Sequence, residues 1–459
     1  MRISPVAVIV IVLWIVGFLT AIMVRRTPAV LCAGMMCGFL FLPQFSIDLP
    51  GLQLGKQNLL MIVTAAYVSM IATEHLPRFR LHILDLPLIG YMCSIYASSL
   101  SNGLGSYDGC VGALANFLIW GLPWFIGRIV FASPLNALVL ARWVVLGALI
   151  YLPFCLIEMR LAPTLHATVY GYTLRKTAAF MRYGFWRPTV FMDFGLQLAL
   201  FMGIASIVAL WASITGKIHR VWHVATKRWA ISLGVLTVFC VGTGAIILTV
   251  VGWILVLRSR SRLQRIPLLA LGLLPILYPL YRMANVGQVS AVEVSEKSSE
   301  IGNRLQSLNT RILNEEKFLS RWQQRPWLGW TGRYYSFDKG EAIADSLWIQ
   351  KLAKNGIAGW SCVTAMMLLP CLRSFWRLPV HGVDNPQFVF AVCVVIFMLD
   401  CLANAMENPV YVLMAGSIVS MPVVVNDVTS AGNSVSPVTA SPRVARSLWP
   451  RSVESAIEN

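Results

Sequence analysis

Charged side chains are scarce in this chain of 459 residues, of which 12% are Asp, Glu, Lys or Arg and 57% are hydrophobic. A soluble globular protein has about 25% charged residues, so a water-soluble enzyme of this length is excluded. The composition also excludes a disordered chain, a collagen and a small disulfide-stapled secreted domain. The ten cysteines include no C-x-x-C pair and lie almost entirely in apolar stretches, which predicts that they act as small hydrophobic residues.

Long apolar runs are abundant instead. A bilayer core about 30 Å thick takes roughly 20 apolar residues per helix, and many runs near this length follow one another. A β-barrel would show short alternating segments. The sequence therefore predicts an all-α, polytopic membrane bundle of about 13 transmembrane helices. The single runs are 6–24, 28–42, 59–73, 83–100, 110–131, 136–157, 189–214, 266–284, 357–372, 388–405 and 409–425.

The run 229–257 needs separate treatment because it is too long for one comfortable span. Both of its flanks are basic, at Lys227 and Arg228 before it and at Arg258 after it. Both flanks should therefore lie on the same side of the membrane. We expect two short helices here, with a hinge at 242–244.

The excess of positive charge sets the topology. Lys and Arg number 37 against 20 Asp and Glu, for a net charge of +17, and much of the excess lies in short loops. The positive-inside rule puts these loops in the cytoplasm and the N-terminus outside. Two long external loops result, 158–188 and 285–345, the second of them before the last three helices. We expect residues 1–425 to form the transmembrane domain and 426–459, rich in Ser, Pro, Val and Arg, to form a disordered cytoplasmic tail.

The first external loop is basic, which runs against the positive-inside rule. Arg182 and Arg187 flank several aromatic residues just before a membrane helix. One interpretation is an amphipathic segment bound to lipid headgroups. The other is an anion site, because the planar fork of Arg donates two parallel hydrogen bonds to phosphate and stays charged. A lipid-linked pyrophosphate would present its charge at this depth.

The second external loop is nearly neutral and contains an amphipathic pattern over 301–324, which predicts a helix. Arg304 and Arg311 are two turns apart and so share a face of this helix. An exposed helix with Glu–Lys pairs is the alternative interpretation. Asp345 and Ser346 then open a further helix. An N-cap explains Asp345 without any catalytic role.

The order of these motifs resembles the O-antigen ligase/polymerase-like membrane proteins. Their C-terminal signature is an Arg, a helix, a P-x-x-G-x-G turn, a His-Asn pair that opens a helix, and Gly-x-x-Gly. The matching residues in this chain are Arg311, Arg325-Pro-Trp-Leu-Gly329-Trp-Thr-Gly332, Asp345-Ser346 and Gly356-Ile-Ala-Gly359. The segment from Arg182 to Pro188 is similar to the family's other external Arg segment, and Thr243-Gly244-Ala245 is similar to its Ser-Arg-Gly-Ala motif, without the Arg.

The resemblance implies a GT-C-like glycosyltransferase in the bacterial cytoplasmic membrane, with its active face external or periplasmic. It implies an undecaprenyl-pyrophosphate-linked glycan donor, a glycan acceptor and other polysaccharide-assembly proteins as partners, besides the membrane lipids. No metal or cofactor is expected. The pyrophosphate is expected to bind Arg182, Arg187, Arg304 and Arg311, with Arg311 and Asp345 as the catalytic residues.

One departure from the family pattern bears on the activity. Asp345 and Ser346 stand where the family has His-Asn, and in the ligases this His is the candidate group that activates the acceptor. The departure favours a polysaccharide polymerase over an O-antigen ligase to lipid A core. A transporter or flippase of lipid-linked oligosaccharides is the other alternative. Such proteins usually show internal repeats and charges within their membrane helices; we find no repeat and few such charges, namely Arg142, Asp193 and Asp400. A nucleic-acid partner has no soluble domain to bind.

The topology can be tested by labelling. Thr168→Cys and Ser298→Cys lie in the two external loops and should react with a membrane-impermeant thiol reagent in intact spheroplasts. Labelling that occurs only after lysis would overturn the assignment of both loops to the outer face.

Overall fold

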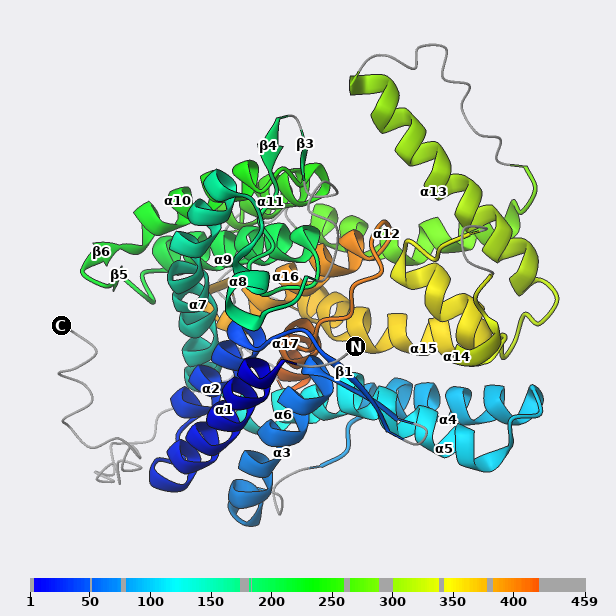
Figure 1. Cartoon of the computed structure of the whole chain (residues 1–459), viewed down its shortest axis with the longest axis horizontal. Helices are drawn as coiled ribbons and strands as arrows, with labels where there is room; N and C mark the ends of the chain where they lie inside the picture. Colours follow the sequence, from blue (N-terminus) through cyan, green and yellow to red (C-terminus); the bar gives the residue numbers. More distant parts are fainter. Residues whose placement is uncertain are drawn as a thin grey trace, which may run out of the picture.

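The computed structural model describes residues 4–49, 52–75, 80–173, 181–182, 184–259, 265–288, 300–337, 342–377 and 383–420 (Figure 1). The predicted tail 426–459 lies outside these residues. The described chain is helical apart from loops and three small two-stranded antiparallel hairpins, so the predicted all-α class is confirmed.

The helices follow one another with short connections over most of the chain. The first half contains α1 (Pro5–Val24), α2 (Pro28–Phe41), β1 (Ser46–Leu49), β2 (Leu52–Gly55), α3 (Lys56–His75), η2 (Ile83–Asp85), α4 (Leu86–Ser101), α5 (Gly105–Asn116), the π-helical turn η3 (Phe117–Gly121), α6 (Leu122–Val130), α7 (Pro134–Leu161) and α8 (Leu165–Tyr170). The second half contains β3 (Met181–Arg182), β4 (Phe185–Trp186), α9 (Gly195–Thr215), β5 (Arg220–Val221), β6 (Val224–Ala225), α10 (Thr226–Phe239), α11 (Thr243–Leu257), α12 (Arg265–Ala284), α13 (Glu300–Trp322), α14 (Thr331–Tyr334), α15 (Leu347–Arg377), α16 (Pro386–Asp400) and α17 (Pro409–Val419).

Several of these helices are long and apolar enough to cross a membrane, so the protein is a helical membrane protein. The described residues contain seven of them: Pro5–Val24, Ile83–Ser101, Gly105–Val130, Pro134–Leu161, Gly195–Thr215, Arg265–Ala284 and Leu347–Arg377.

The expected count of about 13 spans is wrong when only helices long and apolar enough to cross a membrane are counted. Four predicted spans form the apolar helices α2, α11, α16 and α17, which have only 11 to 15 residues. At 1.5 Å per residue these helices are about 17–23 Å long, which is short of the roughly 30 Å bilayer core. Not every apolar run in the sequence is thus a full span: α2 ends at Phe41, one residue before the end of its run 28–42, so this run is itself too short.

The predicted break in 229–257 is confirmed. The helices α10 and α11 are separated by Cys240, Val241 and Gly242, immediately before and at the expected hinge. Val241 has a positive φ of 53°, a conformation that ends a helix. Both helices pack against α9.

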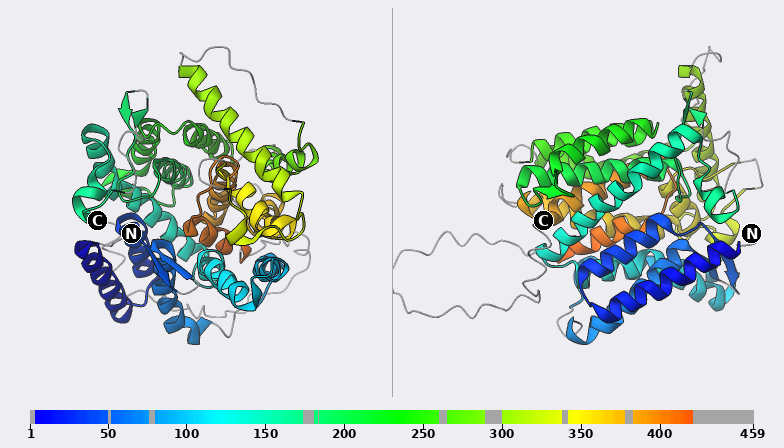
Figure 2. Two further views of the ribbon diagram at one scale, coloured as in Figure 1. Left: turned by 45° about the vertical axis from the view of Figure 1, so that its right-hand side comes forward. Right: turned by 60° about the vertical axis from the view of Figure 1, so that its left-hand side comes forward.

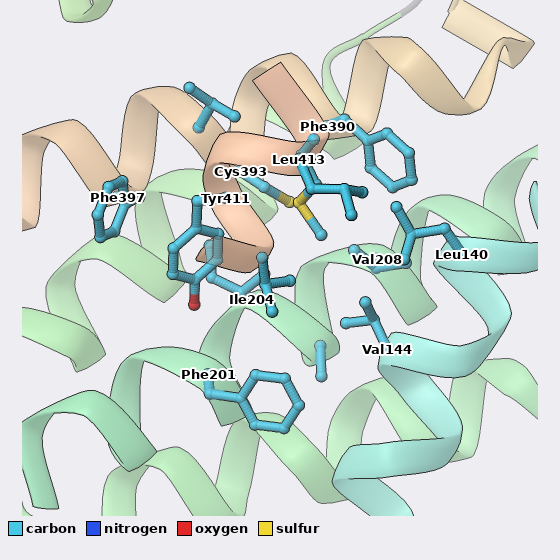
Figure 3. Close-up of a cluster of buried hydrophobic side chains, with 14 of the residues drawn as sticks. Leu140, Val144, Phe201, Ile204, Val208, Phe390, Cys393, Phe397, Tyr411 and Leu413 are labelled. Carbon is cyan, nitrogen blue, oxygen red and sulfur yellow. The ribbon is translucent and has the colours of Figure 1, made fainter. Parts of the chain in front are cut away.

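Helix α9 forms the centre of the bundle. In its most apolar stretch of 18 residues, 83% of the residues are buried, compared with 22% in the corresponding stretch of α1. A helix that is apolar all round is buried in this way by its neighbours. Side chains of α9 pack against side chains of α7, α16 and α17 in the core (Figure 3). The labelled core residues are Leu140, Val144, Phe201, Ile204, Val208, Phe390, Cys393, Phe397, Tyr411 and Leu413.

The two ends of the bundle differ in their connections (Figure 2). Helix α13, the N-terminus and hairpin β1–β2 lie at one end, which we call the α13 end. The opposite end carries the basic connections, including Arg25 after α1, Arg220 in β5 and Arg258 after α11. Basic residues also lie at the α13 end, for example Arg311 and Arg321 in α13, so the topology expected from the positive-inside rule stays a prediction.

A loop segment is inserted into a break in α15 at the α13 end. Gly356 interrupts the helix with φ 64° and ψ −166°, a conformation that only glycine adopts readily. The carbonyls of Pro326 and Trp327 accept hydrogen bonds from the N–H groups of Ile357 and Ala358, at 2.8 and 3.2 Å. In the other direction, Trp330 N donates to the Ala353 carbonyl at 2.9 Å. We call this contact the α15 interlock.

Two glycines make the α15 interlock possible. A Cβ on Gly356 would lie 2.3 Å from the Trp327 backbone, and a Cβ on Gly329, whose φ is 66°, would lie 2.6 Å from Gly356 N. The P-x-x-G turn and the Gly-x-x-Gly motif are therefore two halves of one contact. This explains physically why both motifs occur in the same chain.

We expect Gly356→Ala and Gly329→Ala to lower Tm in detergent, because each forces a side chain into a glycine-only conformation at a cost of about 1–3 kcal/mol and against backbone atoms. Gly332→Ala is the matched control, since Gly332 belongs to the same turn and a Cβ there meets nothing within 4 Å. Equal Tm values for all three variants and the wild type would contradict the interlock.

Candidate functional site

An open polar cavity lies at the α13 end and has a volume of about 380 Å³. Its walls come from hairpin β1–β2, the start of α3, the entry to α9, the first turns of α15 and the loop between α16 and α17. Five amide side chains line it, together with two lysines and two carboxylates. These side chains are Gln44, Gln57, Asn58, Gln197, Gln350, Lys56, Lys354, Asp193 and Glu407.

A buried ion pair forms the floor of this cavity. Lys351 Nζ lies 2.6 Å from Glu407 Oε1 and donates to the Tyr91 hydroxyl at 2.8 Å. The ammonium also lies 4.9 Å from the ring centroid of Trp120, whose indole N–H donates to the same Glu407 oxygen at 3.3 Å. The Lys351 side chain is 4% exposed and that of Glu407 is 23% exposed, so Glu407 is the partner that faces the cavity.

The charges around Glu407 decide its ionisation. Burial alone would raise the pKa of this carboxyl, but the positive charges of Lys351 and Lys354 and the hydrogen bonds from Lys351 and Trp120 outweigh burial. The net effect holds the pKa of Glu407 below its usual value. The carboxylate is therefore ionised at neutral pH and keeps the cavity floor polar.

The structure brings Arg311 and Asp345 to neighbouring positions beside the α16–α17 loop, which lines the cavity. We call this position the rim; neither side chain lines the cavity itself. Arg311 Nη1 donates to the Ala403 carbonyl at 2.6 Å, and Asn314, one turn further along α13, donates to Asp345 Oδ2 at 2.9 Å. The loop that holds Ala403 continues into the cavity wall at Glu407. The rim and the cavity thus share one loop.

Asp345 lies just before α15 and does not occupy the cap position itself. The first helical bond is Gln350 N to the Ser346 carbonyl, at 3.1 Å, so Ser346 stands at the cap. The Leu347 N–H donates instead to the carbonyls of Cys401 and Asn404. The hydrogen bond that the Asp345 carboxylate accepts comes from Asn314. Of the two cap candidates, Ser346 is the one that the structure supports.

Arg187 is buried next to the turn between α10 and α11. Its Nη2 donates to the Val241 carbonyl, in the turn between α10 and α11, at 2.6 Å. Its aliphatic stem packs so closely on Gly195 that a Cβ there would lie 2.4 Å from Arg187 Cδ. Gly195 begins α9, and Asp193 just before it lines the cavity. Arg187 therefore fixes one wall of the cavity to the α10–α11 turn.

The α10–α11 turn also lies close to the rim, through Asp400. A Cβ on Gly244 would lie 3.9 Å from Asp400 Oδ1, and Asp400 in turn interacts electrostatically with Arg311. The motif Thr243-Gly244-Ala245, singled out in the sequence, thus lies beside a carboxylate on which the charge of Arg311 acts. Asp400 also accepts a hydrogen bond from the Asn404 side chain at 2.8 Å.

Two of the expected pyrophosphate ligands have side chains outside the part of the chain that the structure describes. The backbone of Arg182 pairs with Phe185 in hairpin β3–β4, and the backbone of Arg304 lies in the second turn of α13. Both backbones belong to elements at the α13 end (Figure 1). The expectations about these two arginines stay predictions.

The sequence reasoning did not identify Lys351, Lys354, Lys56 or Glu407. The three lysines lie in the first turns of apolar helices, and Glu407 lies in the loop just before α17. In the sequence, charges at such positions look like ordinary helix flanks. A usable signal was present, because ionisable residues at membrane depth are functional by default. No pattern in the sequence pairs Lys351 with Glu407, which lies 56 positions later.

Metal ligands do not gather in the described residues: these contain no group of three or more His, Cys, Asp or Glu side chains placed to hold a metal ion.

Comparison of the chain with models of known protein families and with curated proteins finds no match. The resemblance to the O-antigen ligase/polymerase-like proteins accordingly rests on the order and spacing of short motifs.

The Lys351–Glu407 pair can be tested by a double-mutant cycle. Lys351→Met leaves a buried carboxylate without its cation, and Glu407→Gln leaves a buried ammonium without its anion. Breaking a buried pair costs about 3–5 kcal/mol, so each single variant should lower Tm in detergent markedly.

The double variant should lose much less than the sum of the two single losses, because neither charge is then left unpaired. Strictly additive losses would show that the two groups do not stabilise each other.

Proposed function

We propose that this protein is a metal-independent glycosyltransferase that takes glycan units from an undecaprenyl-pyrophosphate-linked donor at the outer face of the bacterial cytoplasmic membrane. Its role is chain extension in the synthesis of a surface polysaccharide. The observation that carries the proposal is that Arg311 binds the α16–α17 loop, which lines the polar cavity, while Asn314 on the same face of α13 holds Asp345. Arg187 packs on Gly195, two residues after the cavity residue Asp193.

The reaction needs positive charge where the pyrophosphate leaves. The acceptor hydroxyl oxygen bonds to the anomeric carbon while the bond from that carbon to the pyrophosphate oxygen breaks. Arginine stabilises the departing charge through two parallel hydrogen bonds. Arg311 suits this role because it reaches the rim from an external helix and uses one guanidinium nitrogen, Nη1, on the Ala403 carbonyl.

The acceptor hydroxyl needs a group that orients it and takes its proton. Asp345 is half-buried at the rim, and its carboxylate is held by Asn314 at 2.9 Å. A carboxylate fixed in this way can orient a hydroxyl. Because Asp345 stands where the ligases have His, the proposal favours polymerisation over transfer to lipid A core.

A transporter of lipid-linked oligosaccharides is the second candidate. The observation in its favour is the set of charges held within the bundle, above all Lys351 and Glu407, since such charges often mark a substrate pathway. A transporter would move the lipid-linked unit without changing its length, and an assay of product length therefore separates the two functions.

We expect purified protein in liposomes to convert a lipid-linked repeat unit into longer chains. Arg311→Lys and Asp345→Asn should each reduce the polymer formed at least tenfold, with normal abundance in the membrane. Lys cannot reproduce the bidentate contact, and a lost charge-assisted hydrogen bond costs about 1.5–3 kcal/mol, or roughly tenfold to a hundredfold in rate.

Arg333→Lys is the matched control, because the Arg333 side chain is 68% exposed and pairs only with Asp108 at the surface. Its activity should equal that of the wild type. Full activity of both Arg311→Lys and Asp345→Asn would remove the chemistry from this rim, and transfer of unextended lipid-linked units across the bilayer would favour the transporter.

A further inference from the structure

The lining of the polar cavity suits a sugar. Amide side chains both donate and accept hydrogen bonds, which matches a ring of hydroxyl groups. Two aromatic rings, those of Phe45 and Phe194, lie in the same lining and can cover the apolar face of a sugar ring. A volume of about 380 Å³ is near the lower end of ordinary ligand sites, so one or two sugar units fill it.

The cavity and the ion pair at its floor contain one more ammonium group than carboxylate groups. Lys351 and Glu407 neutralise each other at the floor. Lys56 Nζ donates to the Phe191 carbonyl at 3.1 Å, and the negative charge of Asp193 acts on this ammonium. Lys354 has to share the charge of Glu407 with Lys351. Among the described residues no salt bridge joins Lys354 Nζ to a carboxylate, so three ammonium groups meet only two carboxylates here.

The position of Lys354 is fixed before any ligand arrives. Its Nζ lies 4.5 Å from the ring centroid of Tyr335. The neighbouring carbonyl, that of Ala353, accepts the Trp330 N–H in the α15 interlock. A cation held by such contacts loses little freedom when an anion binds, which favours affinity.

We propose that the polar cavity binds a sugar unit that carries one anionic group, a carboxylate or a phosphate ester, with Lys354 as its counter-ion and the amide side chains on its hydroxyls. The inference rests on the proposed glycosyl transfer, in which this unit belongs to the acceptor glycan. The arginines at the rim bind the donor pyrophosphate, so the two anions occupy separate positions.

The test is a saturation-transfer NMR titration of purified, full-length protein in detergent, without any donor lipid. The observed probes are methyl glucuronide, glucose 6-phosphate and methyl glucoside. Inorganic phosphate has no carbon-bound proton to observe and is therefore titrated as a competitor against them. We expect the wild type to bind one of the two acidic sugars at least about tenfold more tightly than methyl glucoside, since a charge-assisted hydrogen bond contributes that much. The acidic probe that binds more tightly identifies the anionic group.

Lys354→Gln should abolish this preference and leave the binding of methyl glucoside unchanged, while Lys354→Arg should retain most of it. Lys227→Gln is the matched control, because it removes the same charge from an exposed position at the opposite end of the bundle. If Lys354→Gln does not fold, the inference is still tested by comparing the affinities of the wild type and of Lys354→Arg for acidic and neutral sugars.

Equal affinity of the wild type for acidic and neutral sugars would overturn the inference, as would an undiminished preference in Lys354→Gln. Inorganic phosphate that binds as tightly as the acidic sugars would also overturn it, because the hydroxyl contacts would then contribute nothing. Because no transfer is measured, these outcomes are independent of the polymerisation assay. Failure of polymerisation alone would overturn the proposed function.

Discussion

The break in α15 at Gly356 is the constraint on which the α13 end of the molecule depends. A continuous helix would have no unpaired N–H groups for the carbonyls of Pro326 and Trp327. With the break, the loop that holds Pro326 and Trp327 is joined to α15 by backbone hydrogen bonds. The half of α15 before Gly356 carries Lys354, which lines the cavity, and Lys351, which pairs with Glu407 beneath it, so the same contact sets the positions of both charges.

Charges inside an apolar bundle must be compensated, and this requirement explains the arrangement around the loop between α16 and α17. Glu407 satisfies Lys351, and the backbone carbonyl of Ala403 satisfies Arg311. Carbonyls of this loop also accept the Leu347 N–H at the start of α15. One loop therefore meets the electrostatic needs of two helices. Any movement of it would leave buried charges unpaired, at a cost of several kcal/mol.

Local signals in the sequence predicted the local structure well. The pattern over 301–324 predicted α13, and the two basic flanks predicted the turn between α10 and α11. Helix lengths were predicted less well, because hydropathy does not show where a cap or a turn begins. The pairing of Lys351 with Glu407 is a tertiary contact between two charges of unremarkable local context. Periodicity cannot reveal such a contact, so the cavity itself was missed although its rim residues Arg311 and Asp345 were named.

A polar cavity in a membrane bundle is a departure from the packing that stability alone would favour. Filling it with apolar side chains would remove the desolvation cost of its charges and bury more surface. Proteins carry such departures mainly at functional sites, where local consistency is given up for chemistry. The cavity meets the rim that holds Arg311 and Asp345, and the two regions share a loop. This adjacency suits the proposed transfer, because the acceptor hydroxyl must reach the anomeric carbon from which the pyrophosphate departs.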